Sequence, residues 1–445
     1  MRSKFGRRPY GAIPEDAVAR CRARGAWLLL CGFLLIAAGP LSARATPAHP
    51  LSLAEAERLA LADEPGARAL EARSSALAAE AKAAEALPVP TLRVGLNNYP
   101  IERGGFSTEG MTSAGVTLRQ AFPPAGARDL REQRLDWMAQ ALRWHGTDRN
   151  RVVRLEVRRA WLDLYLGQRS QALLREARPL FEDLLEVTRS LYAVGRKSQQ
   201  DVLRAELELG RLADRQIEAE RLAAEALADL TRWTGPLASP RLPETMPELP
   251  PVPDDSTLAD ALEAHPRLRA AEAQLEADHR TVNLAETERK PGWALDLSYA
   301  YREGELPNGE PRSDFVTVGL SMELPFLRRQ AVDDRLRGAL ESRDASAWER
   351  DNLRRELLAG IATETARWRD LGRRITLYDR EILPNAAATA AAAKRAYQSD
   401  AADFADVMRA AIDELDARLE RLRLAVQRAR SQAALAYLGG LGHDA

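Results

Sequence analysis

The sequence predicts a mainly α-helical fold that also places a small β-sheet in a membrane. Three observations carry this prediction. The chain repeats itself in one register, long stretches show heptad spacing, and four segments of about ten residues alternate apolar and polar side chains. Strands of that length suit a tilted crossing of a bilayer. We expect duplicated long α-helical hairpins that form a tunnel, and four strands per chain that contribute to a trimeric, twelve-stranded membrane β-barrel.

The first 45 residues have the composition of a secretory signal peptide. Basic residues precede an apolar run over 26–38, and the triplet Ala43-Arg44-Ala45 follows. A charged segment, a short apolar segment and a small-residue site predict cleavage after Ala45. An uncleaved anchor is the alternative, but the run is shorter than the roughly 20 residues that span a bilayer. We therefore expect an exported protein with residues 1–45 as its signal peptide.

Composition excludes several classes of function. Both cysteines, Cys21 and Cys31, lie in the leader, so the mature chain would have neither a disulfide nor a thiolate metal site. The formal net charge is -1, and nucleic acid is therefore not an expected partner. The sequence lacks a phosphate-binding loop, a Gly-x-Ser-x-Gly motif and a zinc-binding histidine pair. We expect no enzyme activity, no cofactor and no resident metal.

The two halves of the chain repeat each other. Asp201-Val202-Leu203-Arg204-Ala205 recurs as Asp406-Val407-Met408-Arg409-Ala410, and the offset between matched residues stays between 201 and 205. Further matched pairs are Pro65 with Pro266, Pro88 with Pro291, Pro179 with Pro384, and Tyr192 with Tyr397. This register predicts a first repeat over 46–234 and a second over 256–445. Seven prolines within 235–255 predict an extended linker between them.

Each repeat should contain the same series of helices. Short helices are expected from residue 53 and over 66–86, then over 258–264 and 266–289. Long helical stretches follow over 125–193 and 329–396, and last helices over 199–233 and 404–438. Apolar residues step by four and three, as at Leu180, Leu184, Val187 and Leu191, which predicts knobs-into-holes packing. A coiled-coil scaffold would show the same pattern, so the helices alone identify no function.

Each repeat also contains a predicted β-hairpin, at about 91–122 and about 293–324. Leu92, Val94 and Leu96 alternate with polar or small residues, and Val316, Val318 and Leu320 do the same in the second repeat. We expect the apolar sides to face lipid and the polar sides to face a lumen. A soluble hairpin packed on the helices would alternate equally well, and remains the alternative for any single strand.

The number of strands predicts an oligomer. No apolar run of 18 or more residues follows Ala45, so a membrane crossing would have to use strands. Four strands cannot close a barrel, because about eight is the smallest number that packs. An open sheet edge in lipid leaves backbone groups without partners, at a prohibitive cost. Several chains must therefore pool their strands, and a homotrimer would supply twelve.

Two motifs at the ends of the long helices resemble those of a known family. They are Tyr192-x2-Gly195-x2-Ser198-x2-Asp201-Val202-Leu203 and Tyr397-x8-Asp406-Val407-Met408. With two hairpins and long helices behind a signal peptide, they resemble the TolC family of outer-membrane efflux proteins over about residues 50–440. The resemblance implies an outer-membrane channel with a long periplasmic extension. Such a channel passively conducts substrates from an inner-membrane pump of the resistance-nodulation-division type through a periplasmic adaptor, or membrane fusion, protein.

The hairpin sequences resemble one subtype of that family. Asn97-Asn98-Tyr99-Pro100 and Arg119-Gln120-Ala121-Phe122-Pro123-Pro124 are similar to members that partner heavy-metal cation pumps, although Gly126-Ala127 replaces the usual Gly-Lys. Drug or organic-substrate efflux stays open, because the mature histidines are scattered without ligand spacing. The main competing function is a periplasmic coiled-coil adaptor or scaffold that forms no channel.

The resemblance also assigns candidate sites. The adaptor-contact candidates at the helix ends are Tyr192, Gly195, Arg196, Ser198, Tyr397 and Asp400. Asp201 and Asp406 are the candidates for the channel constriction, where a threefold assembly would make each one a ring of charges. A carboxylate in a first helical turn is also favoured by the helix dipole, so a helix cap is the alternative role. Arg409 stands where the family has a second acidic residue, and Arg196 or Lys197 is expected to supply a basic partner.

Overall fold

The computed structural model describes residues 50–62, 64–237, 240–399 and 401–440, and the predicted signal peptide lies outside them. The first half contains α1 (Leu53–Ala62), α2 (Pro65–Glu85), β1 (Thr91–Asn97), β2 (Ser113–Phe122), α3 (Ala127–Ala193) and α4 (Gln199–Thr234). The second half contains α5 (Asp255–Ala261), η1 (Leu262–Ala264), α6 (Pro266–Thr287), β3 (Trp293–Tyr301), β4 (Phe315–Met322), η2 (Pro325–Arg328), α7 (Arg329–Leu377), η3 (Tyr378–Ile382), α8 (Leu383–Gln398) and α9 (Phe404–Leu438).

The four strands form one antiparallel sheet in the order β1-β2-β3-β4. The central pair, β2 and β3, joins the two halves of the chain through a register that runs from Ala114 with Tyr301 to Phe122 with Trp293. β1 and β4 are the edges of the sheet, so each has one side without a strand partner within the described chain. The four antiparallel strands predicted from the alternation are confirmed. Across the described ranges, no helix is both long and apolar enough to cross a membrane.

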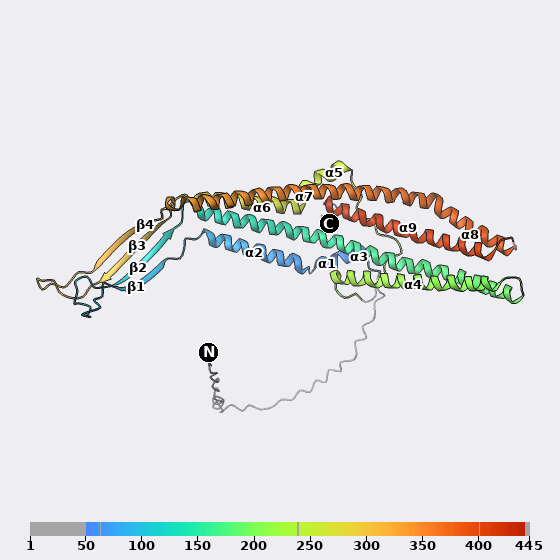
Figure 1. Cartoon of the computed structure of the whole chain (residues 1–445), viewed down its shortest axis with the longest axis horizontal. Helices are drawn as coiled ribbons and strands as arrows, with labels where there is room; N and C mark the ends of the chain where they lie inside the picture. Colours follow the sequence, from blue (N-terminus) through green and yellow to red (C-terminus); the bar gives the residue numbers. More distant parts are fainter. Residues whose placement is uncertain (1–49, 63, 238–239, 400, 441–445) are drawn as a thin grey trace, which may run out of the picture. The chain divides into compact units, whose positions relative to one another are not determined.

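The helices pack around α3. This helix contacts α1, α2, α4, α6 and α9, while α7 contacts α6 and α9. Among the residues from 50 to 440, the sheet lies at one end of the long helices, and the α3–α4 and α8–α9 turns lie at the other (Figure 1). Trp161 of α3 is fully buried in the main core with Leu162, Leu230 and Val426. Of the predicted heptad series, Leu184 is buried and Leu180 partly buried in a seam between the helices, whereas Val187 is exposed.

Where the structure describes it, over 235–237 and 240–254, the proline-rich linker contains neither helix nor strand, and it hydrogen-bonds to the helices. Gln168 Nε2 donates to the carbonyl of Pro240 at 2.9 Å, and Tyr165 Oη donates to that of Glu244 at 2.9 Å. Gln432 of α9 donates to the carbonyl of Pro250 at 2.7 Å. Proline has no backbone N–H and interrupts the hydrogen-bond ladder of a helix, so carbonyls of the linker remain free to accept from side chains. The linker therefore connects α3 and α9 by side-chain-to-backbone hydrogen bonds.

The second long helical stretch differs from the prediction. A single helical stretch was expected over 329–396, but a π-helical turn, Tyr378–Ile382, separates α7 from α8. Pro384 has no N–H for the carbonyl of Arg380, and the widened turn lets the N–H of Leu383 reach the carbonyl of Tyr378 instead. The matching proline of the first half, Pro179, lies inside α3 without such a turn.

Candidate functional site

The sheet has one apolar face that crosses all four strands. Leu92, Leu118, Leu297 and Val318 are register partners from β1 to β4, and they form one row of that face. The large side chains of the apolar face are Leu92, Val94, Leu96, Val116, Leu118, Phe122, Trp293, Leu295, Leu297, Tyr299, Tyr301, Val316, Val318, Leu320 and Met322. All of them are exposed, Val318 and Leu320 at 69% each. An apolar surface of this extent is typical of contact with lipid or protein.

The opposite face of the sheet is polar. Arg93, Thr117, Ser298 and Thr317 form one row across the strands, and the hydroxyls of Thr117 and Ser298 lie 2.9 Å apart. In the next row the Arg119 guanidinium lies 3.9 Å from the Asp296 carboxylate, which also accepts a 3.0 Å hydrogen bond from Ser321. The predicted division into an apolar and a polar side is therefore present in the register.

Gln120 is the one polar residue that the alternation places among the apolar side chains. Its amide nitrogen donates to the carbonyl of Pro88 at 2.9 Å, in the segment that leads into β1. It also donates to the carbonyl of Ala121 at 2.9 Å. Gln120 thus satisfies backbone carbonyls at the helix end of the sheet, which the alternation by itself could not show.

The first tip, residues 192–201, is a glycine-capped turn between α3 and α4. Gly195 has a φ of 74°, as expected for a glycine at a helix C-terminus. The N–H of Gly195 donates to the carbonyl of Tyr192 at 2.9 Å, and the N–H of Arg196 donates to that of Leu191 at 2.9 Å. This pair of bonds is a Schellman motif, which ends the helix and exposes Tyr192 and Arg196 at the surface.

Asp201 is part of a capping box at the start of α4. The Ser198 hydroxyl accepts from the N–H of Asp201 at 3.3 Å, and the Asp201 carboxylate accepts from the N–H of Ser198 at 3.2 Å. The same carboxylate accepts from the Ser198 hydroxyl at 2.9 Å. Both residues therefore stabilise the helix terminus, which is the alternative role considered for Asp201.

Asp406 has a different environment at the second tip, residues 397–406. Its side chain is 60% exposed, and the Arg409 guanidinium lies 3.9 Å away. The N-cap residue of α9 is Asp403, whose side chain makes no capping hydrogen bond. The N–H of Ala401 donates to the carbonyl of Ala396 at 2.8 Å, and Asp400 lies outside the described residues. Of the two aspartates that occupy equivalent positions in the sequence, Asp406 has the more accessible carboxylate.

Lys197 connects the two tips. Its side chain is only 14% exposed, its Nζ lies 3.8 Å from the Asp403 carboxylate, and it lies 5.4 Å from the centre of the Tyr397 ring. Tyr397 also meets Phe404 edge to face at 6.1 Å. Lys197 was one of two candidates for a basic partner, and the carboxylate it reaches is Asp403. The sequence rule that places Asp before a helix start could have identified Asp403.

A shared apolar core supports both tips. Its buried residues come from α3, α4 and α9 and include Phe181, Leu184, Ala205, Leu212, Phe404, Val407, Met408 and Leu415. In the second copy of the repeated motif, the exposed Asp406 is followed by two buried side chains, Val407 and Met408, whereas Leu203 of the first copy is exposed. This core holds the tips together in one chain.

Comparisons with known proteins agree with this geometry. Residues 257–441 match the model of a family described as outer membrane efflux protein. The chain is 29% identical over 416 residues to Protein CyaE of Bordetella pertussis, covering 88% of this chain and 85% of that protein. It is 27% identical over 255 residues to the proteases secretion protein PrtF of Dickeya chrysanthemi, covering 52% of this chain and 54% of that protein.

The fold is similar to that of a solved outer-membrane channel. The structure of OprN superposes with a TM-score of 0.75 at 21% identity, covering 88% of this chain and 90% of that one. The resemblance to outer-membrane efflux proteins is thereby confirmed at the level of the family match and the fold. The expected location, the cell outer membrane with a periplasmic extension, is confirmed as well.

Proposed function

We propose that three copies of this chain form the outer-membrane exit channel of a tripartite export system. The four strands of each copy would close a twelve-stranded barrel, and the helices would continue the lumen into the periplasm. The tips would meet a periplasmic adaptor, which connects the channel to an inner-membrane pump of the resistance-nodulation-division type. The chain itself would conduct passively and perform no chemistry.

One observation carries this proposal: the apolar face of the sheet is continuous from β1 to β4 and ends at two open edges. Backbone groups at an open edge are not satisfied in lipid, so the edges need strands from other copies. Four strands from one chain are too few to enclose a lumen. A scaffold without a channel would have no use for this exposed apolar face.

The proposal is tested by extraction and conductance. Salt washing should leave the mature protein in the membrane fraction, and detergent should release it as a trimer when its mass is measured by light scattering. Reconstituted trimers should give discrete conductance steps in planar bilayers. A water-soluble, monodisperse mature monomer would contradict the proposal.

The cargo is proposed from two different sources. The name of PrtF, a proteases secretion protein, supports polypeptide cargo. The hairpin sequences Asn97-Asn98-Tyr99-Pro100 and Arg119-Gln120-Ala121-Phe122 support heavy-metal cations instead. Deleting the gene in its own host separates the two. Loss of exported proteins from the medium would indicate polypeptide cargo, and increased sensitivity to heavy-metal salts with unchanged secretion would indicate cations.

A further inference from the structure

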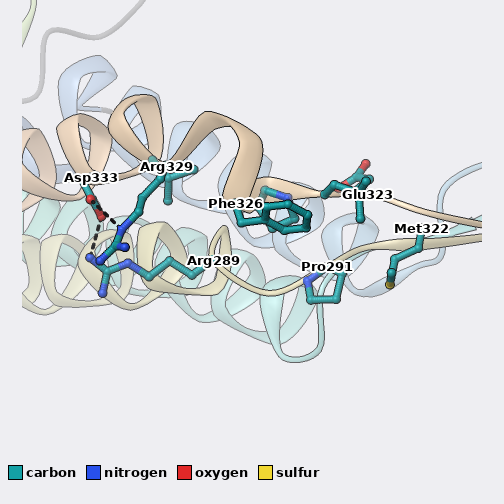
Figure 2. Close-up of a pocket in the computed structure, with 10 residues that line it drawn as sticks. Arg289, Pro291, Met322, Glu323, Phe326, Arg329 and Asp333 are labelled. Atoms are coloured by element: carbon teal, nitrogen blue, oxygen red, sulfur yellow. Dashed lines mark hydrogen bonds and ion pairs between the residues drawn. The ribbon is translucent and has the colours of Figure 1, made fainter.

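A cavity of about 470 Å³ lies where the sheet meets the helices of the second half. Its walls come from the segment that joins α6 to β3, with Arg289 and Pro291, and from the segment that leads from β4 into α7. We call it the junction cavity (Figure 2). None of the candidate site residues named from the sequence lines this cavity. Its presence is not explained by the proposed channel lumen or by the tips.

One side of the junction cavity is apolar and continues the lipid-facing surface. Met322 belongs to the last row of the apolar face, with Phe122 and Trp293 as partners across the sheet. Beyond it, Leu324 and Phe326 are also exposed, Phe326 at 68%. Aromatic side chains collect where the apolar band of a membrane barrel meets the headgroups. The row of Phe122 and Trp293 therefore marks the depth at which hydrocarbon gives way to headgroups.

The other side of the junction cavity is basic. The guanidinium groups of Arg289 and Arg329 converge on one carboxylate, that of Asp333, at 2.8 Å and 3.7 Å (Figure 2). Two guanidiniums that share a single carboxylate keep a net positive charge and most of their N–H donors. Glu323 also lines the cavity, but it lies at the sheet end, beyond Phe326 from the two arginines (Figure 2), and both arginines pair with Asp333. Forked N–H donors of this kind match the oxygens of a phosphate group.

We propose that the junction cavity binds the headgroup of an anionic phospholipid from the periplasm-facing leaflet. Arg289 and Arg329 hold the phosphate, and the acyl chains extend over Phe326, Leu324 and Met322 toward the apolar face. The cavity is basic toward the helices and apolar toward the sheet, which is the order in which a lipid presents its phosphate and its hydrocarbon. The bound lipid fixes the depth of the sheet at its junction with α7. This inference rests on the outer-membrane location and not on the export activity.

Lipid binding is measured by native mass spectrometry of the full-length mature protein in detergent, titrated with phosphatidylglycerol and, separately, with phosphatidylcholine. We expect phosphatidylglycerol to bind more tightly. The double variant Arg289→Gln/Arg329→Gln should weaken phosphatidylglycerol binding by about 30-fold, because each arginine near a lipid surface contributes substantially. The matched control is Arg337→Gln/Arg354→Gln, which removes two exposed, ion-paired arginines of α7 outside the cavity and should leave binding unchanged.

A gain-of-binding variant protects the test against a fold defect. Asp333→Asn keeps both arginines but removes the carboxylate that they share, so it should bind phosphatidylglycerol more tightly. Inorganic phosphate alone should not displace the lipid, because it lacks the chains that Phe326 and Leu324 contact.

Three outcomes would overturn the inference. These are equal binding by the double variant and its control, full displacement by inorganic phosphate, or loss of the trimer in the double variant with unchanged lipid affinity. The last outcome would assign the cavity to a second copy of the chain, which could pair with the open edge of β4. Conductance of the same samples tests the export channel separately, so the two proposals fail independently.

Discussion

At the residue scale, Glu64 shows how one buried carboxylate is stabilised. It is 6% exposed at the N-terminus of α2, where it accepts from the N–H of Ala67 at 2.5 Å and from Arg149 Nη2 at 2.9 Å. Burial by itself raises the pKa of this carboxyl. The hydrogen bonds from Arg149 and from the backbone N–H groups of Ala67 and Gly66 outweigh burial, and the pKa of Glu64 is lowered overall.

The lowered pKa predicts how stability depends on pH. A carboxyl with a pKa below its unfolded value of 4.5 stabilises the folded state above that value, and this contribution is lost as pH falls through the folded pKa. Glu64→Gln should therefore cost about 1–3 kcal/mol at neutral pH and progressively less in acid. Thermal unfolding, followed by circular dichroism at neutral pH and again in acid, measures the difference in stability between Glu64→Gln and the unmodified protein. Glu71→Gln, an exposed position of the same helix, is the control and should change little at either pH.

The two aspartates at the tips show the limit of sequence interpretation at this scale. The repeat places Asp201 and Asp406 in equivalent positions, and the cap and the charged ring were both considered for each. The structure separates them, because Asp201 is bonded to Ser198 in a capping box whereas Asp406 is exposed beside Arg409. The difference arises at the N-cap residue, which is Ser198 in one tip and Asp403 in the other. Both residue types are common N-caps, so the sequence does not specify that only Ser198 hydrogen-bonds to the backbone.

We predict different effects for these aspartates in planar bilayers. Asp406→Asn should reduce the preference for cations, because it removes one accessible charge per chain from the proposed constriction. Asp201→Asn should leave ion selectivity nearly unchanged and instead lower the stability of the α4 terminus by about 0.5–2 kcal/mol. The reversal potential in a salt gradient measures selectivity. If Asp406→Asn does not shift it in a correctly assembled trimer, Asp406 contributes no selective charge to the constriction.

At the element scale, helix ends and strands follow from local sequence, whereas interruptions depend on tertiary packing. Gly195 and the alternation of Val316, Val318 and Leu320 specify a cap and a strand directly. Pro179 and Pro384 are equivalent in sequence, yet only the second accompanies a π turn. In that turn Arg421 of α9 donates to both carboxylate oxygens of Asp379, at 2.9 Å and 3.0 Å, and lowers the pKa of Asp379. A contact between distant segments of this kind has no signature in periodicity.

Close packing of α3 on α4 predicts opposite effects for two helical glycines. A Cβ added at Gly167 would lie 2.8 Å from the Cα of Ala223, a backbone atom that cannot move alone. Gly167→Ala should therefore cost about 1–3 kcal/mol. Gly210 of α4 has nothing within 4 Å of such a Cβ, so Gly210→Ala should stabilise by about 0.5–1 kcal/mol. Thermal unfolding of both variants measures the two changes in stability. Stabilisation by both substitutions would show that α3 and α4 lie farther apart at Gly167 than the structure has them.

At the scale of the whole molecule, the sequence predicts the strands and their faces but not what covers them. The apolar face is exposed on every strand of one chain. Neither β1 nor β4 finds a second partner within the described chain. A sheet of this kind is incomplete by itself, because its unpaired edges and its apolar side both need surroundings that the chain does not provide. In the proposed trimer, lipid and further copies together would satisfy these needs.

The contrast between the apolar and the polar face of the sheet gives the most direct test of which face meets lipid. Val318→Arg and Leu320→Arg place a charge on the apolar face, where each should cost about 2–4 kcal/mol near the middle of a bilayer. Thr317→Arg places the same side chain one residue away, in the polar row with Arg93, Thr117 and Ser298, and should cost much less. Ser321→Arg is a second control on the polar face. It also removes the hydrogen bond from Ser321 to Asp296, so it should cost somewhat more than Thr317→Arg but still less than a charge on the apolar face.

Assembly is measured as the fraction of detergent-extracted protein that runs as a trimer after equal expression. We expect Val318→Arg and Leu320→Arg to lose most of it and Thr317→Arg to keep it. Equal tolerance of all four substitutions would mean that the apolar face does not lie in hydrocarbon. A reversed order, with Thr317→Arg the most damaging, would instead place lipid on the row of Arg93, and the lumen would then be lined by Leu92, Leu118, Leu297 and Val318.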